Sequence, residues 1–255
     1  MEKDFTLKSS PETYGLKLIP RHVAMIMDGN GRWARQRSFA RIRGHREGVE
    51  SVRAVVRIAG KIGVEWLTLY AFSQENWCRP KTEVEALMHL LEKFLKNEID
   101  ELNMNHVQLH AIGQLEDLPV RVRRQLSLTQ KATEKNTGLK LILALSYGSR
   151  REMTQAVRQI AREVLEGRIA PEDVDEVLVS RHLYTKDYPD PDLVIRTSGE
   201  LRISNFLLWQ ISYAEFVVSP VLWPDFRKEH FLEAIREYGF RHRRFGKVHP
   251  IPSPL

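Results

Sequence analysis

The feature that most constrains this chain is a short apolar run that ends at an aspartate and opens into a glycine-rich loop. Residues 23–27 read VAMIM, which is typical of a strand buried on both faces. Asp28 follows, and Gly29 and Gly31 allow the backbone to take a positive φ or to approach a ligand closely. Arg32 then begins a predicted helix. This pattern fits a phosphate anion with a divalent cation held by Asp28, and an ordinary strand–helix turn with a capping aspartate is the alternative.

The bulk composition is that of one globular domain. The chain has 255 residues, 42% of them hydrophobic and 28% charged, and no apolar stretch approaches the roughly 18 residues that a membrane span needs. The amino terminus lacks the pattern of a secretory signal, and the single cysteine, Cys78, excludes an internal disulfide and fits a reducing cytosol. We therefore expect a cytoplasmic protein in which residues 1–20 form an N-terminal arm.

Positive charge is concentrated in two places. The net charge is +6, and residues 32–46 contain six arginines and no acidic residue. A second cluster near the carboxyl terminus consists of Arg241, Arg243, Arg244 and Lys247. Aromatic residues are not spaced among these arginines as stacking platforms for nucleic acid would require. A compact, highly charged anion is therefore a better partner for them than nucleic acid.

Short apolar runs alternate with helical patterns along the rest of the chain. Further strands are predicted at 66–72, 106–112, 139–145, 193–196 and 215–218, and helices at 46–62, 83–102, 119–136, 151–166 and 171–183. This alternation predicts a single α/β domain with a mostly parallel, six-stranded sheet and helices on both faces. Ligands of such folds bind beyond the carboxyl ends of the strands, where Asp28, residues 73–79 and residues 196–204 all fall.

Several long motifs resemble those of cis-prenyltransferases, in particular bacterial undecaprenyl diphosphate synthases. The matching stretches are HVAMIMDGNGRWA, the RIRGH segment, LTLYAFSQENWCRP, and DLVIRTSGELRISNFLLWQISYAEF followed by LWPDF. They occur in the family's order from about residue 21 to the RRFG near the carboxyl terminus. The resemblance implies a catalytic domain over residues 21–246 with an apolar tunnel, and a tail at 247–255.

The resemblance also implies an activity, the condensation of isopentenyl diphosphate with an allylic diphosphate such as farnesyl diphosphate. The expected product is a long polyprenyl diphosphate, the undecaprenyl carrier of cell-wall assembly. Because positive charge develops on the allyl carbon as diphosphate leaves, catalysis needs guanidinium groups, a divalent cation and a site that excludes water. By resemblance, Asp28 is a catalytic residue and a Mg²⁺ ligand, and Glu215 is the second ligand. A salt-bridged strand carboxylate is the alternative for Glu215.

The resemblance assigns residues to each substrate. The allylic diphosphate is expected to contact Gly29, Asn30, Gly31, Arg32, Trp33, Arg41 and His45. Plain packing for Trp33, a surface position for Arg41 and helix capping for His45 are the alternatives. Isopentenyl diphosphate is expected to contact Arg196, Arg202, Ile203 and Ser204, whose donors suit a diphosphate. One departure is Leu201, where some relatives carry histidine, and it leaves the two arginines more important.

Polar groups at the reacting centre are expected from the segment after the second strand: Ser73, Gln74, Glu75, Asn76, Trp77 and Arg79. The resemblance makes Asn76 a catalytic residue in removing a proton from the condensing unit. A neutral amide is a poor base, so we interpret Asn76 as orienting a water molecule or a diphosphate oxygen that takes the proton. Glu75 is the competing acceptor.

The growing hydrocarbon needs an apolar space, which the resemblance places between helix 83–102 and the sheet. The expected strand residues are Ala71, Leu139, Leu141 and Leu143, and the expected helix stripe is Val84, Leu87, Met88, Leu91, Phe94, Leu95 and Ile99. Ordinary core packing is the alternative for all of these residues.

The resemblance also implies how the chain assembles. Arg244-Phe245-Gly246 is similar to an element that reaches the partner subunit's site, which implies a homodimer, and peripheral membrane contact is expected during product release. Two rival interpretations are a non-catalytic partner subunit of the same fold and a nucleic-acid-binding module that uses the arginines. Partner subunits typically lack the cation ligand or the phosphate loop, and both are present here, so the enzyme is favoured.

Overall fold

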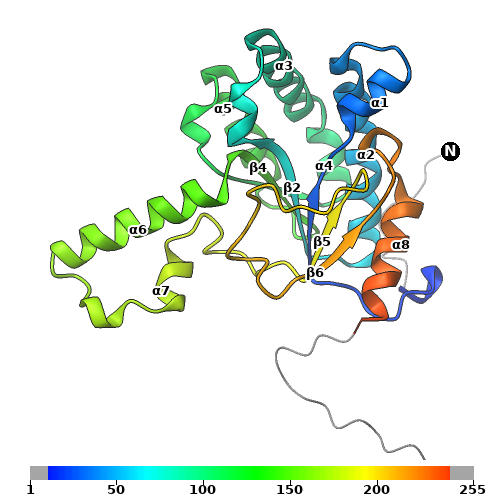
Figure 1. Ribbon diagram of the computed structural model, residues 1–255. Helices are drawn as coiled ribbons and strands as arrows, with labels where there is room; N and C mark the ends of the chain where they lie inside the picture. The colour runs from blue at the N-terminus through cyan, green and yellow to red at the C-terminus, as the bar shows by residue number, and fades with distance from the viewer. Residues whose placement is uncertain (1–10, 242–255) are drawn as a thin grey trace, which may run out of the picture.

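The structure is a computed structural model that describes residues 11–241. Six strands form one sheet: β1 (His22–Ile26), β2 (Trp66–Ser73), β3 (Gln108–Ile112), β4 (Lys140–Tyr147), β5 (Leu193–Arg196) and β6 (Glu215–Val218). Their order is β3-β4-β2-β1-β5-β6, and every neighbouring pair is parallel. The predicted α/β domain with a six-stranded parallel sheet is confirmed, with β1 and β2 at its centre (Figure 1).

Eight α-helices flank the sheet within residues 11–241: α1 (Asn30–Gln36), α2 (Arg41–Ile62), α3 (Lys81–Asn97), α4 (Ile99–Met104), α5 (Val120–Thr133), α6 (Ser149–Leu165), α7 (Glu176–Arg181) and α8 (Lys228–Gly239). The helices differ from the sequence prediction in four places. The predicted helix 171–183 is divided into a 3₁₀ turn, Pro171–Asp173, and the short α7. The arginine-rich run after Arg41 already belongs to α2, the predicted helix 83–102 is broken at Glu98, and α8 was not predicted. Short 3₁₀ turns include η1 (Pro11–Tyr14), η2 (Gln74–Cys78) and η5 (Trp223–Asp225).

The two faces of the sheet are covered differently. Side chains alternate along β1, so Val23 and Met25 enter the larger hydrophobic core, whereas Ala24 and Ile26 enter a smaller one. Residues of α2, α3, α5 and α8 complete the larger core. The smaller core is closed by an irregular segment that includes Phe206, so helices do not form the second layer alone as the sequence predicted. Packing of Phe206, Leu207 and Ile211 on this face therefore holds this part of the irregular segment against the sheet.

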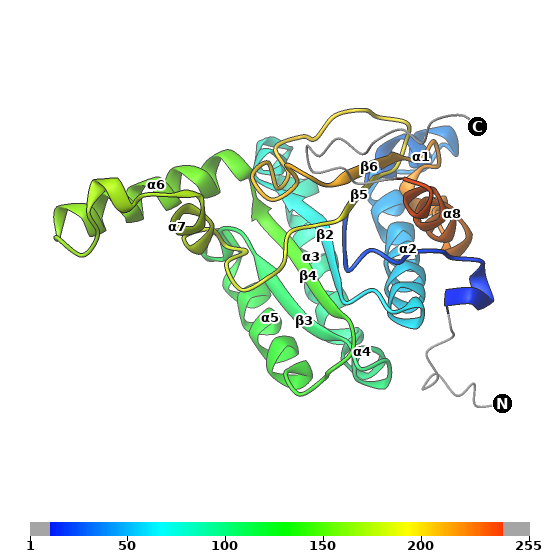
Figure 2. The same ribbon diagram turned by 90° about the horizontal axis from the view of Figure 1, so that it is seen from below.

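Helices α6 and α7 project away from the sheet (Figure 1 and Figure 2). The first turn of α6 is anchored by Glu152, which is buried and accepts hydrogen bonds from Tyr147 Oη (2.6 Å), Tyr184 N (2.9 Å) and Gln210 Nε2 (3.1 Å). Burial raises the pKa of the Glu152 carboxyl, although these hydrogen bonds oppose the shift. This carboxylate thus ties the end of β4 to the irregular segment.

The two ends of the chain differ in what the structure describes. Leu16 is buried and Tyr14 packs on the larger core, so the second half of the predicted arm lies along the domain. The predicted tail at 247–255 and the Arg244-Phe245-Gly246 element lie outside the described residues. Within residues 11–241, no helix combines the length and apolar character that crossing a membrane requires.

Candidate active site

Asp28 and Arg196 meet where the neighbouring parallel strands β1 and β5 end side by side. Ile26 pairs with Arg196 in register, and Arg196 Nη2 donates to Asp28 Oδ2 at 2.9 Å. The Thr197 hydroxyl accepts from the Asp28 backbone N–H (2.9 Å) and donates to its carbonyl (2.7 Å). Thr197 was not among the predicted site residues, although its position directly after a strand was a signal. The carboxylate is therefore held in position from both backbone and side chain.

Three guanidinium groups surround the Asp28 carboxylate. Besides Arg196, Arg32 Nη2 and Arg202 Nη2 lie 3.5 and 3.6 Å from Oδ2. Burial alone would raise the pKa of Asp28, but the hydrogen bond from Arg196 and the charges of Arg196 and Arg32 hold it below its usual 3.8. Asp28 is therefore ionised at neutral pH.

The glycine loop brings its backbone close to other elements. Gly29 has φ 109°, a left-handed conformation that favours glycine, and a Cβ there would lie only 3.0 Å from Leu222 Cδ2. At Gly31 a Cβ would lie 3.1 Å from Arg41 Nε. Gly29 is thus favoured by its conformation and by close approach, whereas at Gly31 the lack of a larger side chain leaves room for the Arg41 guanidinium.

A second basic group lies across the loop from Asp28. Arg41 Nε and Arg79 Nη1 both contact Glu83 Oε1, at 3.3 and 3.1 Å. His45 lies in the same wall, and its buried Nε2 has no hydrogen-bond partner among residues 11–241. Burial, with the positive charges of Arg79 and Arg41, lowers the pKa of His45 to about 4. At neutral pH this imidazole of the cavity wall is therefore uncharged.

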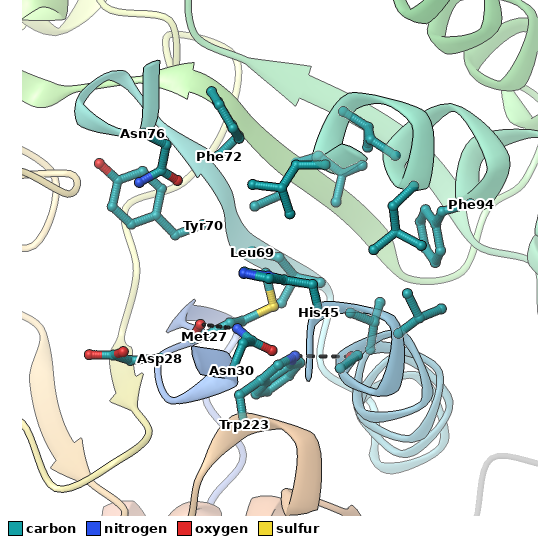
Figure 3. A pocket seen from close by; sticks show the side chains of 18 of the residues that line it. Met27, Asp28, Asn30, His45, Leu69, Tyr70, Phe72, Asn76, Phe94 and Trp223 are labelled. Carbon is teal, nitrogen blue, oxygen red and sulfur yellow. Dashed lines mark hydrogen bonds between the residues drawn. The ribbon is translucent and has the colours of Figure 1, made fainter. Parts of the chain in front are cut away.

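These polar groups form one end of a cavity of about 220 Å³ between α2, α3 and the sheet. Figure 3 shows Asp28, Asn30, His45 and Asn76 towards one end and Phe94 at the other. The apolar part is lined by Val49, Val52, Leu69, Ala71, Phe72, Leu87, Met88, Leu90, Leu91, Phe94, Leu143 and Leu145. A charged mouth thus continues into an apolar space.

The comparisons with known proteins agree with this geometry. The family model described as "Putative undecaprenyl diphosphate synthase" matches residues 26–246. An isoprenyl transferase of Geobacillus kaustophilus is 53% identical over 230 residues, covering 90% of each chain, and one of Bacillus anthracis is 49% identical over 247 residues, covering 97% of this chain and 96% of that one. The chain belongs to the cis-prenyltransferase family.

A solved structure supports the same assignment. The crystal structure of lavandulyl diphosphate synthase from Lavandula x intermedia, in complex with dimethylallyl diphosphate, matches this cis-prenyltransferase with a TM-score of 0.88. The two chains are 38% identical, and the match covers 90% of this chain and 99% of that one. Family and fold are therefore established together.

Not every residue that the resemblance assigned to the allylic substrate of this cis-prenyltransferase reaches the cavity. Gly29, Asn30, Gly31, Arg41 and His45 line it. Arg32 lies in an adjoining hollow with Asp28. Trp33 is buried, and its Nε1 donates to Asp225 Oδ1 at 2.7 Å, so the packing alternative describes it and the prediction that it covers the ligand is not supported.

The predicted residues of the 73–79 segment also form two groups, those that line the cavity and those that do not. Asn76 and Arg79 line the cavity, and Asn76 Oδ1 accepts from Ser73 N at 3.2 Å, which fixes the amide. Trp77 Nε1 donates to Ser146 Oγ (2.8 Å), and Ser146 Oγ donates to Gln74 Oε1 (3.2 Å). Glu75 accepts from Asn205 Nδ2 at 2.8 Å. Gln74, Glu75 and Trp77 therefore attach η2 to neighbouring segments and lie outside the cavity lining.

The predicted isopentenyl diphosphate residues cluster next to Asp28. Arg196 is buried, its Nη1 donates to Ser204 Oγ at 2.8 Å, and its Nε has no partner among the described residues. Arg202 approaches the same carboxylate, and Ile203 is partly exposed beside it in sequence. Glu200, which the sequence analysis did not consider, pairs with Arg32 and Arg202.

Within one chain the structure does not bring Glu215, the predicted second metal ligand, next to Asp28. Glu215 is the first residue of β6 and is level with Leu193, whereas Asp28 follows the opposite, carboxyl ends of the strands. Glu215 is thus level with Val23, about 10 Å along the strand before Ile26, and Asp28 lies two residues beyond Ile26. Glu215 Oε2 instead contacts Arg241 Nη1 at 3.0 Å, the salt-bridged alternative.

A single carboxylate still fits a magnesium ion. Residues 11–241 contain no group of three or more His, Cys, Asp or Glu side chains arranged to hold a metal. Mg²⁺ commonly binds through one or two carboxylates together with substrate phosphates. Asp28 is ionised and faces the cavity, so it fits as the protein's share of such a site.

The structure places some of the predicted tunnel residues at the cavity and others elsewhere. Ala71, Leu87, Met88, Leu91, Phe94 and Leu143 line the cavity. Val84 and Leu95 are buried in the larger core, Leu141 and Leu139 line two separate hollows, and Ile99 lines none of these spaces. The opposite wall comes from α2 through Val49 and Val52, which sequence periodicity marked only as a helical face.

Proposed function

We propose that this cis-prenyltransferase elongates a prenyl chain by condensing isopentenyl diphosphate with an allylic diphosphate, with farnesyl diphosphate as primer and undecaprenyl diphosphate as product. The observation that supports this is one cavity in which arginines and an ionised aspartate adjoin a long apolar wall. Such a space suits a ligand with an anionic head and a hydrocarbon tail. The related lavandulyl enzyme was solved with an allylic diphosphate of this chemical kind.

The allylic diphosphate is assigned to the loop side of the cavity. Arg41, Arg79 and neutral His45 lie there with the backbone of Gly29 and Gly31. Two guanidinium groups provide donors in a fixed geometry and stabilise the charge that develops on the leaving diphosphate. A magnesium ion held by Asp28 would supply further charge neutralisation. The apolar wall shields the developing allyl cation from water.

Isopentenyl diphosphate is assigned to the neighbouring group of Arg196, Arg202 and Ser204. Their donors converge beside Asp28, so the two substrates would be held head to head around one carboxylate. Holding both reactants in place is itself a large part of catalysis of a bimolecular step.

Asn76 is assigned to orient the proton acceptor. Its amide is fixed by Ser73 and lies in the cavity wall. Glu75, the competing acceptor, is paired with Asn205 outside the cavity lining, which supports Asn76 over Glu75. Since an amide is a poor base, a diphosphate oxygen that Asn76 orients would take the proton.

The test is incubation of the full chain with labelled isopentenyl diphosphate, farnesyl diphosphate and MgCl₂. We expect a ladder of extended products, lost with EDTA and in Asp28→Ala. Absence of extension by the wild-type chain alone would favour the partner-subunit alternative. Extension that persists unchanged in Asp28→Ala would refute the assigned site.

Assembly and location complete the proposal. We assign a cytoplasmic homodimer that contacts a membrane surface peripherally when it releases its product. Sedimentation of the full chain tests the dimer, and co-flotation with phospholipid vesicles tests the membrane contact. Tight oligonucleotide binding with a steep salt dependence would be the result expected of the nucleic-acid rival.

A further inference from the structure

Glu200 lies in a turn that is fixed at the edge of the candidate site. Ser198 and Gly199 both have positive φ, 82° and 70°. Their backbone N–H groups donate to the carbonyls of Val221 and Ser219, both at 2.8 Å. The turn that carries Glu200 is therefore attached to the segment after β6, and its side chain extends from a defined point.

The Glu200 carboxylate bridges two of the arginines assigned to diphosphate. Its Oε1 lies 2.8 Å from Arg32 Nη1, and its Oε2 accepts a hydrogen bond from Arg202 Nη1. The other terminal nitrogen of each guanidinium faces Asp28 Oδ2, at 3.5 Å for Arg32 and 3.6 Å for Arg202. Each guanidinium thus has one nitrogen directed to Asp28 and one to Glu200.

Carboxylate and phosphate oxygens compete for the same donors. A guanidinium presents its N–H groups in a planar fork that matches either anion. While Glu200 bridges Arg32 and Arg202, it takes N–H groups that the oxygens of a bound diphosphate would need. The side chain is about a quarter exposed, so it can leave the arginines without disturbing the hydrophobic core.

The same arrangement occurs on the other side of the loop. Glu83 contacts both Arg41 and Arg79, the pair assigned to the allylic diphosphate. Two arginine pairs, each bridged by one carboxylate, indicate that a compensating anion is a regular part of this site.

We propose that Glu200 is an internal counter-anion of the diphosphate site, which substrate displaces from Arg32 and Arg202 and which returns as pyrophosphate leaves. This inference rests on the proposed function and deepens it by assigning a positioning residue. The exchange lowers the net affinity for diphosphate, because each binding event breaks the two Glu200 contacts. It also speeds the release of pyrophosphate from the allylic side, since the carboxylate recaptures Arg32.

The experiment measures binding of inorganic pyrophosphate to the full chain by calorimetry, with and without Mg²⁺. We expect Glu200→Gln to bind pyrophosphate about tenfold more tightly, equivalent to about 1.4 kcal/mol. Glu200→Asp keeps the charge but is too short to bridge both arginines, so we expect an intermediate affinity. In steady-state assays, Glu200→Gln should lower KM for isopentenyl diphosphate and lower kcat, as expected when release of pyrophosphate slows.

Glu65→Gln is the matched control. Glu65 also pairs with an arginine, Arg21 at 2.9 Å, but it precedes β2 at the opposite end of the sheet. It makes the same charge change without touching the site, so its pyrophosphate affinity should equal that of the wild type.

The outcomes separate the two proposals. Failure of the wild-type chain to bind pyrophosphate would count against the proposed function. Binding by the wild type with unchanged or weaker affinity in Glu200→Gln would overturn the role of Glu200. Weakening only in the presence of Mg²⁺ would instead make Glu200 a metal ligand and also overturn it. If Glu65→Gln gained the same affinity for pyrophosphate, the effect would come from the net charge alone, and the role of Glu200 would be overturned.

Discussion

Arg196 Nη2 donates to Asp28 Oδ2 at 2.9 Å across 168 positions of sequence, and this contact joins the ends of β1 and β5. The Arg196 side chain is only 3% exposed, so its charge depends on Asp28 for compensation. The same carboxylate faces the cavity and is the residue assigned to magnesium. One residue therefore joins the ends of two strands and also faces the cavity.

The first prediction concerns that contact. We expect Asp28→Asn to lower the free energy of unfolding at pH 7 by about 2 kcal/mol, because a buried guanidinium loses its charged partner. The pKa of Asp28 is lowered in the folded state, so the ionised carboxylate stabilises the fold above its unfolded-state pKa near 3.8. This contribution is lost as the pH falls through the lowered folded-state value.

Urea unfolding from pH 7 to pH 3 checks this prediction. The difference between wild type and Asp28→Asn should be largest at neutral pH and should shrink below about pH 4. Glu65→Gln, which breaks an exposed ion pair, should cost less than about 1 kcal/mol at every pH. A difference for Asp28→Asn that stays constant with pH would contradict the ionised Asp28–Arg196 pair.

The second prediction concerns His45. Its pKa is about 4 in the folded state, below the 6.5 of a free imidazole, so the unfolded chain binds more protons in acid. Stability should therefore be unaffected by this group above about pH 6.5 and should fall by about 3 kcal/mol as the pH drops to 4. In His45→Gln this part of the acid sensitivity should disappear.

Unfolding curves between pH 7 and pH 4 provide the measurement. His89→Gln is the control, because His89 is exposed on α3. If the slopes of stability against pH are equal in wild type and His45→Gln, then His45 is not buried in its neutral form.

The sequence was sufficient for most of the fold because the signals were local. Each strand is a short apolar run and each following polar segment lies at its carboxyl end, so the positions of Asp28 and Arg196 followed from chain order alone. Glu215 shows the limit of this reasoning. Being in a strand does not say which end of that strand faces the site, and Glu215 starts β6 where Asp28 follows β1.

Contacts between residues far apart in sequence explain the other differences between the predicted site and the structure. The resemblance assigned Trp33 and Trp77 to the substrate site, but their indole N–H groups donate to Asp225 and Ser146, far away in sequence. Glu200 was not predicted because nothing in the sequence marks a lone carboxylate near arginines as a site residue. Only the folded turn shows that it contacts Arg32.

The third prediction concerns the break between α3 and α4, where the sequence predicted one continuous helix. Glu98 lies at the break with its side chain 5% exposed, and Arg53 Nε donates to both carboxylate oxygens at 3.0 and 3.1 Å. We expect Glu98→Ala to lower the free energy of unfolding by about 3 kcal/mol, because it leaves Arg53 without its main partner. Glu101→Ala removes the more exposed pair with Arg57 and should cost less than about 1 kcal/mol.

Chemical denaturation of the single and double variants measures these changes in the free energy of unfolding. Replacing both charges with methionine, Arg53→Met with Glu98→Met, should recover much of the loss, since desolvation of the pair offsets its attraction. A double variant as unstable as Glu98→Ala would mean that the loss comes from packing at the helix break.

The last prediction concerns the length of the product. Ala71 lies where the pairing of β2 with β4 is irregular, near the carboxyl end of the strand and therefore near the charged mouth. Phe94 lies at the other end, and together with Val52 it lines both this cavity and a second hollow formed by residues such as Val56 and Leu141. A growing chain that starts at the mouth passes Ala71 first and reaches Phe94 last.

The two positions should therefore shift product length in opposite directions. We expect Ala71→Leu to block the path early and shorten the products without abolishing condensation, and Phe94→Ala to open the second hollow and lengthen them. Chromatography of dephosphorylated products gives the measurement, with Leu128→Ala on the exposed face of α5 as the control. If all three variants give the wild-type distribution while still condensing isopentenyl diphosphate, the hydrocarbon does not follow the wall between α2 and α3, because a chain packed against that wall must respond to its width.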